Sequence, residues 1–324
     1  MFRHAFRSVN RVALIVAVVS ISSAAFAQGV PRTSWGHPDL QGTWSTATIT
    51  PFERPSEFAG KEFLTKEEAA EFERRTLERT NRDNRDGTAD ADLARAYNDF
   101  WWDSGTRVVP SRRTSLVVDP PDGRVPSLTA EAQQRIAAAA EVRKQRGPAD
   151  HPEDRNLWER CITRGMPNVM LPQVYNGNYE IIQTTDHVVI VAEMIHDARI
   201  IPIDGRKHRP QTIRQLLGDS IGWWEGDTLV VETTNFTNKT NYRGAGDQLR
   251  LVERFTRTAP DVLTYRVTID DPTTFTRPWT VELPAVPSDG RIYEYACHEA
   301  NYGLEGILSG HRAEEKRAAT KSQQ

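Results

Sequence analysis

The fold is decided by residues 249–270, which read LRLVERFTRTAPDVLTYRVTID. Apolar and polar residues alternate over Leu249–Arg257 and again over Val262–Asp270, which predicts two β-strands that each bury one face. The linker between them, Ala259-Pro260-Asp261, is too short for a crossover helix, so the two strands are expected to be antiparallel neighbours. The same texture extends along the chain from Tyr179 onward.

Seven further runs rich in Val, Ile, Thr and Tyr surround this pair, each bounded by turn residues. They are Tyr179–Thr184, Val188–Ile195, Arg199–Ile203, Ser220–Trp224, Thr228–Asn235, Trp279–Leu283 and Ile292–Glu299. Short linkers predict a meander of hairpin-linked strands, and a meander this long removes its exposed edges by closing on itself. The predicted fold class is therefore mainly β, an antiparallel meander closing into an eight- or nine-stranded barrel, which is wide enough for one small ligand.

The residues before this meander have a different texture, with Pro, Gly and aromatic residues at a density that prevents long regular elements. We expect an N-terminal Pro-rich arm that wraps the barrel and carries a short strand near Thr43–Ile49 and two surface helices. A capping box, Thr65-Lys66-Glu67-Glu68, begins the first helix, and Thr129 caps the second. The expected divisions are the arm at 28–178, the barrel at 179–312 and a disordered polar tail at 313–324.

The first 27 residues predict a secretory signal peptide. Three arginines precede an almost wholly apolar run from Val12 to Ala25, and Ala25-Phe26-Ala27 has the small-x-small cleavage pattern, so cleavage is expected before Gln28. The apolar run is shorter than the ~20 residues that a membrane-spanning helix needs. We therefore expect a periplasmic or secreted protein with no membrane span after cleavage; an uncleaved membrane anchor is the alternative.

The composition is that of an ordinary globular protein, with 324 residues, 38% hydrophobic, 26% charged and a net charge of −3. The predicted leader contains three arginines and no acidic residue, so the remainder has 38 basic and 44 acidic side chains. A mildly acidic chain argues against a nucleic-acid partner, which a basic face would bind. No GxSxG, HExxH, GxxxxGK[ST], GxGxxG or EF-hand motif occurs, so neither a cofactor nor a metal is expected.

Cys161 and Cys297 are the two cysteines of the chain. In an oxidising compartment they favour a single structural disulfide. Their separation of 136 positions fits neither a metal knuckle nor a CxxC redox pair. The alternatives are two buried free thiols and, less favoured, a cysteine nucleophile.

Several stretches of the chain form a recognisable set. They are GHPDLQGTW (36–44), residues 115–124, ERC (159–161), EMIHDARIIP (193–202), WEGDTLVVET (224–233), ERFTR (253–257), TIDDP (268–272) and YACHE (295–299). With these stretches the chain resembles a large group of uncharacterised exported bacterial proteins. The Gly42-x-Trp44 pair and the meander are also similar to lipocalins, in which such a pair opens the first strand. These resemblances imply an exported bacterial protein with a lipocalin-like (calycin-type) barrel, and they imply no activity.

Glu253 is the first candidate for chemistry because strand alternation puts it on the same face as Phe255 and two leucines. A carboxylate there must be paired or have its pKa raised, and a raised pKa is how a general acid is made. Tyr265 lies on the apolar face of the next predicted strand, and the strand predicted at 292–299 adds Glu299. The alternative is that Glu253 pairs with an arginine on a neighbouring strand and only sets the register.

A second group of charged residues lies where the predicted strand Val188–Ile195 ends and the strand Arg199–Ile203 begins. Its members are Glu193, His196, Asp197 and Arg199. Loops on a rigid scaffold carry function, so charged side chains at a barrel rim are typical of a site.

The candidate catalytic residues are Glu193, His196, Glu253 and Tyr265, and the candidate ligand-binding residues are Asp197, Arg199, His298 and Glu299. A histidine at a turn is more often a hydrogen-bonded structural residue, and this alternative stays open for His196 and His298.

The favoured hypothesis is an exported periplasmic lipocalin-like barrel that binds a small, largely apolar molecule. The alternative is a periplasmic lyase, isomerase or hydrolase that uses Glu/His acid–base chemistry in the barrel cavity. A structural or adhesive envelope protein is a third hypothesis. The sequence decides neither whether the protein is an enzyme nor its oligomeric state. A barrel filled by its own side chains would count against both hypotheses that place a ligand inside it.

Overall fold

The computed structural model describes residues 29–321 except 85–86, 96–97, 240–241 and 300, so the predicted signal peptide lies outside the described residues. Within these residues ten strands form one sheet, and all of their pairings are antiparallel. The strands are β1 (Gly42–Ser45), β2 (Val117–Asp119), β3 (Asn178–Gln183), β4 (His187–Ala192), β5 (Ala198–Pro202), β6 (Asp219–Glu225), β7 (Thr228–Thr234), β8 (Arg250–Ala259), β9 (Val262–Asp270) and β10 (Trp279–Pro287).

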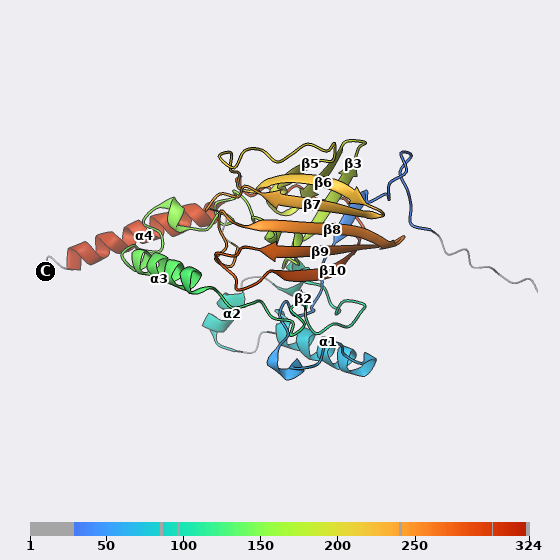
Figure 1. The fold of residues 1–324 in the computed structure, drawn as a ribbon. Helices are drawn as coiled ribbons and strands as arrows, with labels where there is room; N and C mark the ends of the chain where they lie inside the picture. The colour runs from blue at the N-terminus through green and yellow to red at the C-terminus, as the bar shows by residue number, and fades with distance from the viewer. Residues whose placement is uncertain (1–28, 85–86, 96–97, 240–241, 300, 322–324) are drawn as a thin grey trace, which may run out of the picture.

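The sheet curves into a nearly closed barrel (Figure 1). Its strand order is β5-β4-β3-β1-β10-β9-β8-β7-β6, and β2 pairs with β10 outside this path. The two end strands face each other through side chains, because a methyl group added to Gly222 of β6 would lie 3.1 Å from Ile201 of β5. No backbone pairing joins β5 to β6 in the part of the chain that the structure describes.

The predicted fold class is confirmed: the protein is mainly β, with nine antiparallel strands in the nearly closed barrel. The hairpin formed by β8 and β9 places Phe255 opposite Tyr265 and Glu253 opposite Val267. All four side chains are buried, so the alternation in residues 249–270 identifies the inward face correctly.

Two details of the strand prediction are different. Residues 292–299 do not form a strand; they run as coil and turn after β10. Their place beside β10 is taken, since β9 pairs with one edge of that strand and β1 and β2 pair with the other. The strand β1 comes from the predicted arm and inserts between β3 and β10, where Trp44 is 2% exposed and donates its indole N–H to Leu40 at 2.9 Å.

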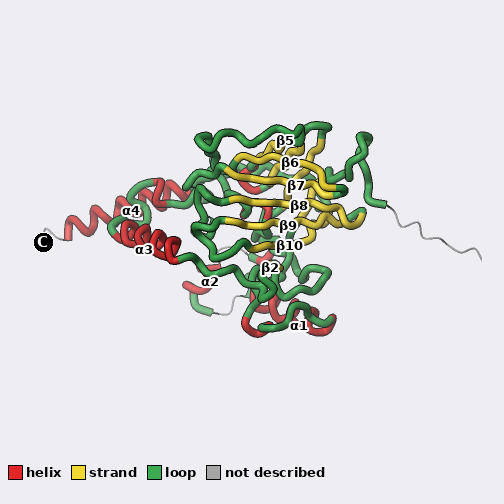
Figure 2. Tube along the Cα trace, in the orientation of Figure 1, coloured by secondary structure: helices red, strands yellow, loops and turns green. Residues whose placement is uncertain are grey.

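The four α-helices of the described chain are α1 (Lys66–Thr80), α2 (Ala89–Arg95), α3 (Ala130–Lys144) and α4 (Tyr302–Lys321). Thr65 and Glu68 form the predicted capping box of α1, and Thr129 accepts from the Ala132 amide at the start of α3. In Figure 2 the helices α3 and α4 lie at one end of the barrel, and α1 lies on the side of the barrel that carries β2.

The helix α4 corrects the prediction of a disordered tail at 313–324, because residues 313–321 are helical. This segment is rich in Ala, Glu, Lys and Arg, which are strong helix formers. His311 and Arg312 also fasten α4 to the loop that follows α3: His311 Nε2 lies 2.7 Å from Asp150 Oδ1, and Arg312 Nη2 donates to the Ala149 carbonyl at 2.9 Å. Residues 322–324 lie outside the described residues.

Candidate functional site

Glu253 and Tyr265 lie together inside the barrel. The Tyr265 hydroxyl donates to Glu253 Oε1 at 2.9 Å, and both residues are fully buried. Arg199 of β5 donates from Nη1 to the same oxygen at 3.0 Å and from Nη2 to Oε2. Glu253 is thus paired with an arginine, which lies on β5 rather than on β7 or β9, the strands that neighbour β8.

The ion pair itself is buried, and the network around it extends to Ser220, which is half-buried. Thr233 and Ser220 place their hydroxyl oxygens 3.3 and 3.4 Å from Arg199 Nη2. Burial, followed by the charge of Glu253, raises the pKa of Tyr265 well above its usual value. A tyrosine that stays neutral and a carboxylate held by an arginine are suited to joining strands across a barrel, not to exchanging protons with a substrate.

The barrel interior beside this network is filled by side chains. A void large enough for one water molecule would leave accessible area on the side chains around it. Tyr179, Phe255, Tyr265 and Val267 have none, at 0% exposed each. The structure therefore leaves no room for a ligand next to these residues, and the expected interior ligand cavity is not present around Glu253.

Glu193 lies apart from this network and is 2% exposed. Its Oε1 accepts from Asn176 Nδ2 at 3.1 Å and from the Tyr293 amide at 3.2 Å, and its Oε2 accepts from Asn178 Nδ2 at 2.8 Å. Burial, followed by the charge of Glu193, raises the pKa of Asp103. The contacts of Glu193 fasten the segment after β10 to the start of β3, which is a structural use of a buried carboxylate.

The other candidate residues do not converge on one point. His196, His298 and Glu299 are exposed, His196 at the turn between β4 and β5 and the other two after Cys297. Asp197 is half-buried, and its Oδ2 accepts from Thr163 Oγ1 at 2.7 Å and from the Arg164 amide at 3.3 Å. Burial raises the pKa of Asp197, and these two hydrogen bonds oppose the rise.

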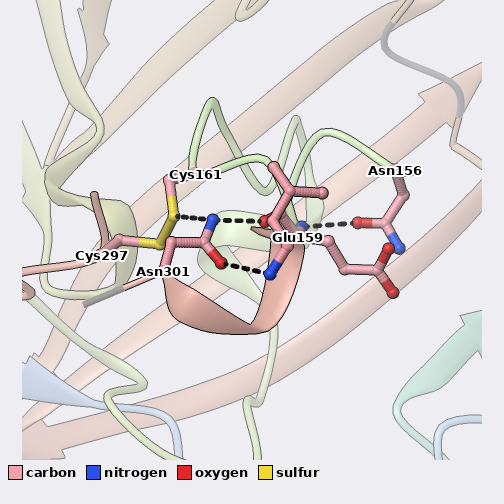
Figure 3. The surroundings of a disulfide bond; sticks show 6 residues. Asn156, Glu159, Cys161, Cys297 and Asn301 are labelled. Atoms are coloured by element: carbon pink, nitrogen blue, oxygen red, sulfur yellow. Dashed lines mark hydrogen bonds between the residues drawn. A yellow bond between two sulfur atoms is a disulfide. The ribbon is translucent and has the colours of Figure 1, made fainter. Parts of the chain in front are cut away.

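The disulfide between Cys161 and Cys297 is present, which confirms the favoured interpretation of the two cysteines. Figure 3 shows the Asn301 side chain next to it, with Nδ2 donating to the Glu159 carbonyl at 2.8 Å and to Cys161 Sγ at 3.2 Å. Asn156 Oδ1 accepts from the Glu159 amide at 2.8 Å. The bond and these contacts hold the irregular segment before β3 against the start of α4.

This irregular segment lines a cleft of about 1090 Å³ at the end of the barrel where β6 begins and β7 ends. Most of the lining comes from residues 153–168, and the remainder is Arg143, Leu216, Thr237 and Lys239. A smaller cleft of about 430 Å³ lies beside the disulfide and shares Trp158 and Glu159 with the first. The disulfide therefore lines the smaller cleft, which adjoins the larger one, and the larger cleft is big enough for a drug-sized molecule.

The larger cleft has an excess of positive charge. The cations that line it and form no ion pair among the described residues are Arg143, Arg160, Arg164 and Lys239. Two of its acidic side chains are already neutralised, Glu159 by Arg155 at 2.7 Å and Asp154 by Arg146 at 2.9 Å. Glu153 is the remaining acid in the lining. A positive cleft on an acidic chain attracts anions.

Sequence reasoning missed this cleft because strand and helix periodicity say nothing about an irregular segment. The sequence did contain a signal for this cleft. Around Trp158 there are three arginines, Arg155 and Arg160 before Cys161 and Arg164 after it. An aromatic residue between arginines, next to a disulfide that fixes the backbone, is a pattern for holding an anion.

No protein-family model, curated protein or solved structure matches this chain. The barrel is consistent with the architecture that the resemblances imply, and no family is shown for the chain. Among the described residues, no helix combines the length and apolarity needed to cross a membrane.

Proposed function

We propose that this is an exported barrel protein that binds a small organic anion with an apolar part, and that the ligand occupies the cleft at the end of the barrel. The observation that carries the proposal is the set of four cations in a cleft of about 1090 Å³ that have no acidic partner among the described residues. Ligand pockets usually measure about 300–1,000 Å³ and hold a few polar groups on an apolar wall. The disulfide fits an extracellular or periplasmic location.

This proposal keeps the binding barrel expected from the sequence but changes where the ligand lies and what it is. The packed interior around Tyr265 argues against a largely apolar ligand there. The enzyme hypothesis receives less support, because Glu253 is fully buried and ion-paired while Glu193 is enclosed by two asparagines. His196, the remaining candidate catalytic residue, is exposed at a turn and forms no hydrogen bond through its side chain in the described structure.

Two fluorescent probes of similar shape test the proposal. Anilinonaphthalene sulfonate carries one negative charge, and phenylnaphthylamine is its uncharged parent. The cationic cleft predicts saturable binding of one sulfonate per protein and binding of the neutral probe about 10-fold weaker or less, because one charge-assisted contact contributes at least about 1.4 kcal/mol. Equal affinity for the two probes would point to an apolar site and refute the proposal.

Matched variants locate the probe. The double variant Arg160→Gln with Lys239→Gln should weaken sulfonate binding about 10-fold or more, because it removes two lining cations. Arg124→Gln removes an exposed arginine outside the cleft and should leave binding unchanged. If the double variant binds the sulfonate as tightly as the unaltered protein, the cleft is not the site.

A further inference from the structure

Arg164 is held in place by neutral groups. Its guanidinium lies over the Trp158 ring, 4.2 Å from the centroid, and its Nη2 donates to Gln173 Oε1 at 2.6 Å. Gln173 is 8% exposed, and its Nε2 donates to the carbonyls of Asn168 and Leu171 at 2.5 and 2.9 Å. Because the amide nitrogen is committed to two carbonyls, the amide oxygen must face Arg164. The guanidinium is thus oriented without being neutralised.

Donor groups of Arg164 are left over. Its Nε is buried without an acceptor, and its Nη1 donates to no described group. The nearby carboxylate of Asp197 does not serve the guanidinium, since it accepts from the Arg164 backbone amide and from the Thr163 hydroxyl. Burial lowers the pKa of Arg164, yet an arginine stays charged at neutral pH. A charged, partly buried group without a counter-charge is a costly arrangement in a structural role.

We infer that Arg164 is the residue of the cleft that binds the ligand, and that the ligand is an organic acid. Its carboxylate accepts hydrogen bonds from the edge of the guanidinium that carries Nη1. The inference rests on the proposed function and names its ligand class. The guanidinium lies over the Trp158 ring, and its Nη1 has no acceptor among the described residues while its Nη2 donates to Gln173. The edge formed by Nη1 and Nη2 therefore still has donors for a carboxylate, which arginine binds through two parallel hydrogen bonds. The apolar part of the acid would lie along the cleft wall near Met166 and Leu216.

The test compares naphthoate with naphthamide, an uncharged isostere, by titration calorimetry on the full mature protein. The unaltered protein should bind naphthoate at least about 10-fold more tightly than naphthamide. Only the carboxylate is negatively charged and accepts two parallel hydrogen bonds from the guanidinium. Arg164→Lys keeps the positive charge but lacks the planar fork, so naphthoate binding should weaken about 10-fold or more while naphthamide binding stays the same. Arg124→Gln is the control for charge outside the cleft, and thermal melting checks that each variant is folded.

The outcomes separate the two proposals. If the unaltered protein binds neither naphthoate nor anilinonaphthalene sulfonate, the proposed function fails and this inference fails with it. If the sulfonate binds but naphthoate and naphthamide bind equally, the inference about the carboxylate is overturned and the cleft remains. Undiminished naphthoate binding by Arg164→Lys likewise overturns the role of Arg164. The comparison of the two probes on the unaltered protein needs no variant, so it stands even if position 164 tolerates no substitution.

Discussion

Replacing Arg199 with methionine should lower the free energy of unfolding by about 3–5 kcal/mol. The side chains of Arg199 and Glu253 are 3% and 0% exposed, so the ion pair is shielded from water. Without the guanidinium, Glu253 keeps one hydroxyl donor at 2.9 Å from Tyr265 and a second at 3.5 Å from Thr233. Breaking a buried pair costs about 3–5 kcal/mol because it leaves one charge uncompensated. Domains are stable by only about 5–15 kcal/mol, so the variant should be close to unfolding.

The double variant Arg199→Met with Glu253→Leu separates the charge effect from packing. It removes both charges and replaces them with apolar side chains of similar volume, so its stability should lie within about 2 kcal/mol of the unaltered protein. Glu253→Leu alone should lower the free energy of unfolding as much as Arg199→Met alone, because it leaves the buried guanidinium without its counter-charge. The sum of the losses of unfolding free energy in the two single variants should therefore exceed the loss in the double variant by several kcal/mol.

Urea unfolding followed by tryptophan fluorescence measures these free energies. Arg266→Gln is the control, since Arg266 forms an ion pair with Glu282 at 3.3 Å on the outer surface, where the side chains are 46% and 31% exposed. That variant should cost no more than about 1 kcal/mol. A loss below about 1 kcal/mol for Arg199→Met, or strictly additive effects in the double variant, would refute the reasoning that this pair joins the barrel wall from within.

Three further predictions concern stability. Tyr179→Phe should be neutral or slightly stabilising, because the buried Tyr179 hydroxyl has no hydrogen-bond partner in the part of the chain that the structure describes. Tyr265→Phe should cost about 1.5–3 kcal/mol because it removes a donor to a buried carboxylate, and urea unfolding compares the two variants. Cys161→Ser should lower the free energy of unfolding by up to about 4–5 kcal/mol, and a reducing agent should then destabilise the unaltered protein but not the variant. Asp103→Asn should raise stability at pH 7 by at most about 0.5 kcal/mol, because burial and the charge of Glu193 raise the pKa of Asp103 and so penalise its carboxylate in the folded state. That gain should vanish below about pH 3, where Asp103 is protonated in the folded and unfolded states alike, and thermal melts across pH would detect a gain that persists there.

The hairpin of β8 and β9 was predictable because its information is local. Alternation over residues 249–270 assigns Glu253, Phe255 and Tyr265 to the inward face, and the short linker makes the two strands antiparallel neighbours. The capping box at Thr65 is local in the same way. Such features depend on neighbouring residues, so the chain alone contains them.

The place of β1 and the partner of Glu253 depend on contacts across long stretches of chain. Trp44 pairs opposite Tyr179, and Arg199 of β5 reaches Glu253 of β8 through the barrel interior. No spacing in the sequence encodes such a contact. The alternation in residues 292–299 is real, but a strand needs a pairing partner. The preceding strand β10 already pairs with β9 along one edge and with β1 and β2 at the two ends of the other. The alternation is thus present in the sequence, but the arrangement of the neighbouring strands prevents these residues from forming a strand.

The candidate site was the least predictable part. Glu193, His196 and Glu253 attract attention because they are chemically versatile, yet in the structure Glu193 and Glu253 are buried and hydrogen-bonded and His196 is exposed. The cleft is built by an irregular segment whose shape depends on the disulfide, on Gln173 and on contacts with the barrel end. Arginines without partners can be recognised only once every possible partner has been located.

The disulfide turns residues 161–297 into a covalent ring that contains the eight strands β3 to β10. A protease that cuts any one loop within this ring opens the circle but releases no fragment, because both new ends stay linked through the two sulfur atoms. The seam between β5 and β6, which has no backbone pairing, lies inside the same ring. A nicked molecule would therefore migrate as one chain without reductant and as two chains with it, and its cleft wall would stay attached to the barrel. For a protein outside the cell, such a ring confers tolerance to single cuts.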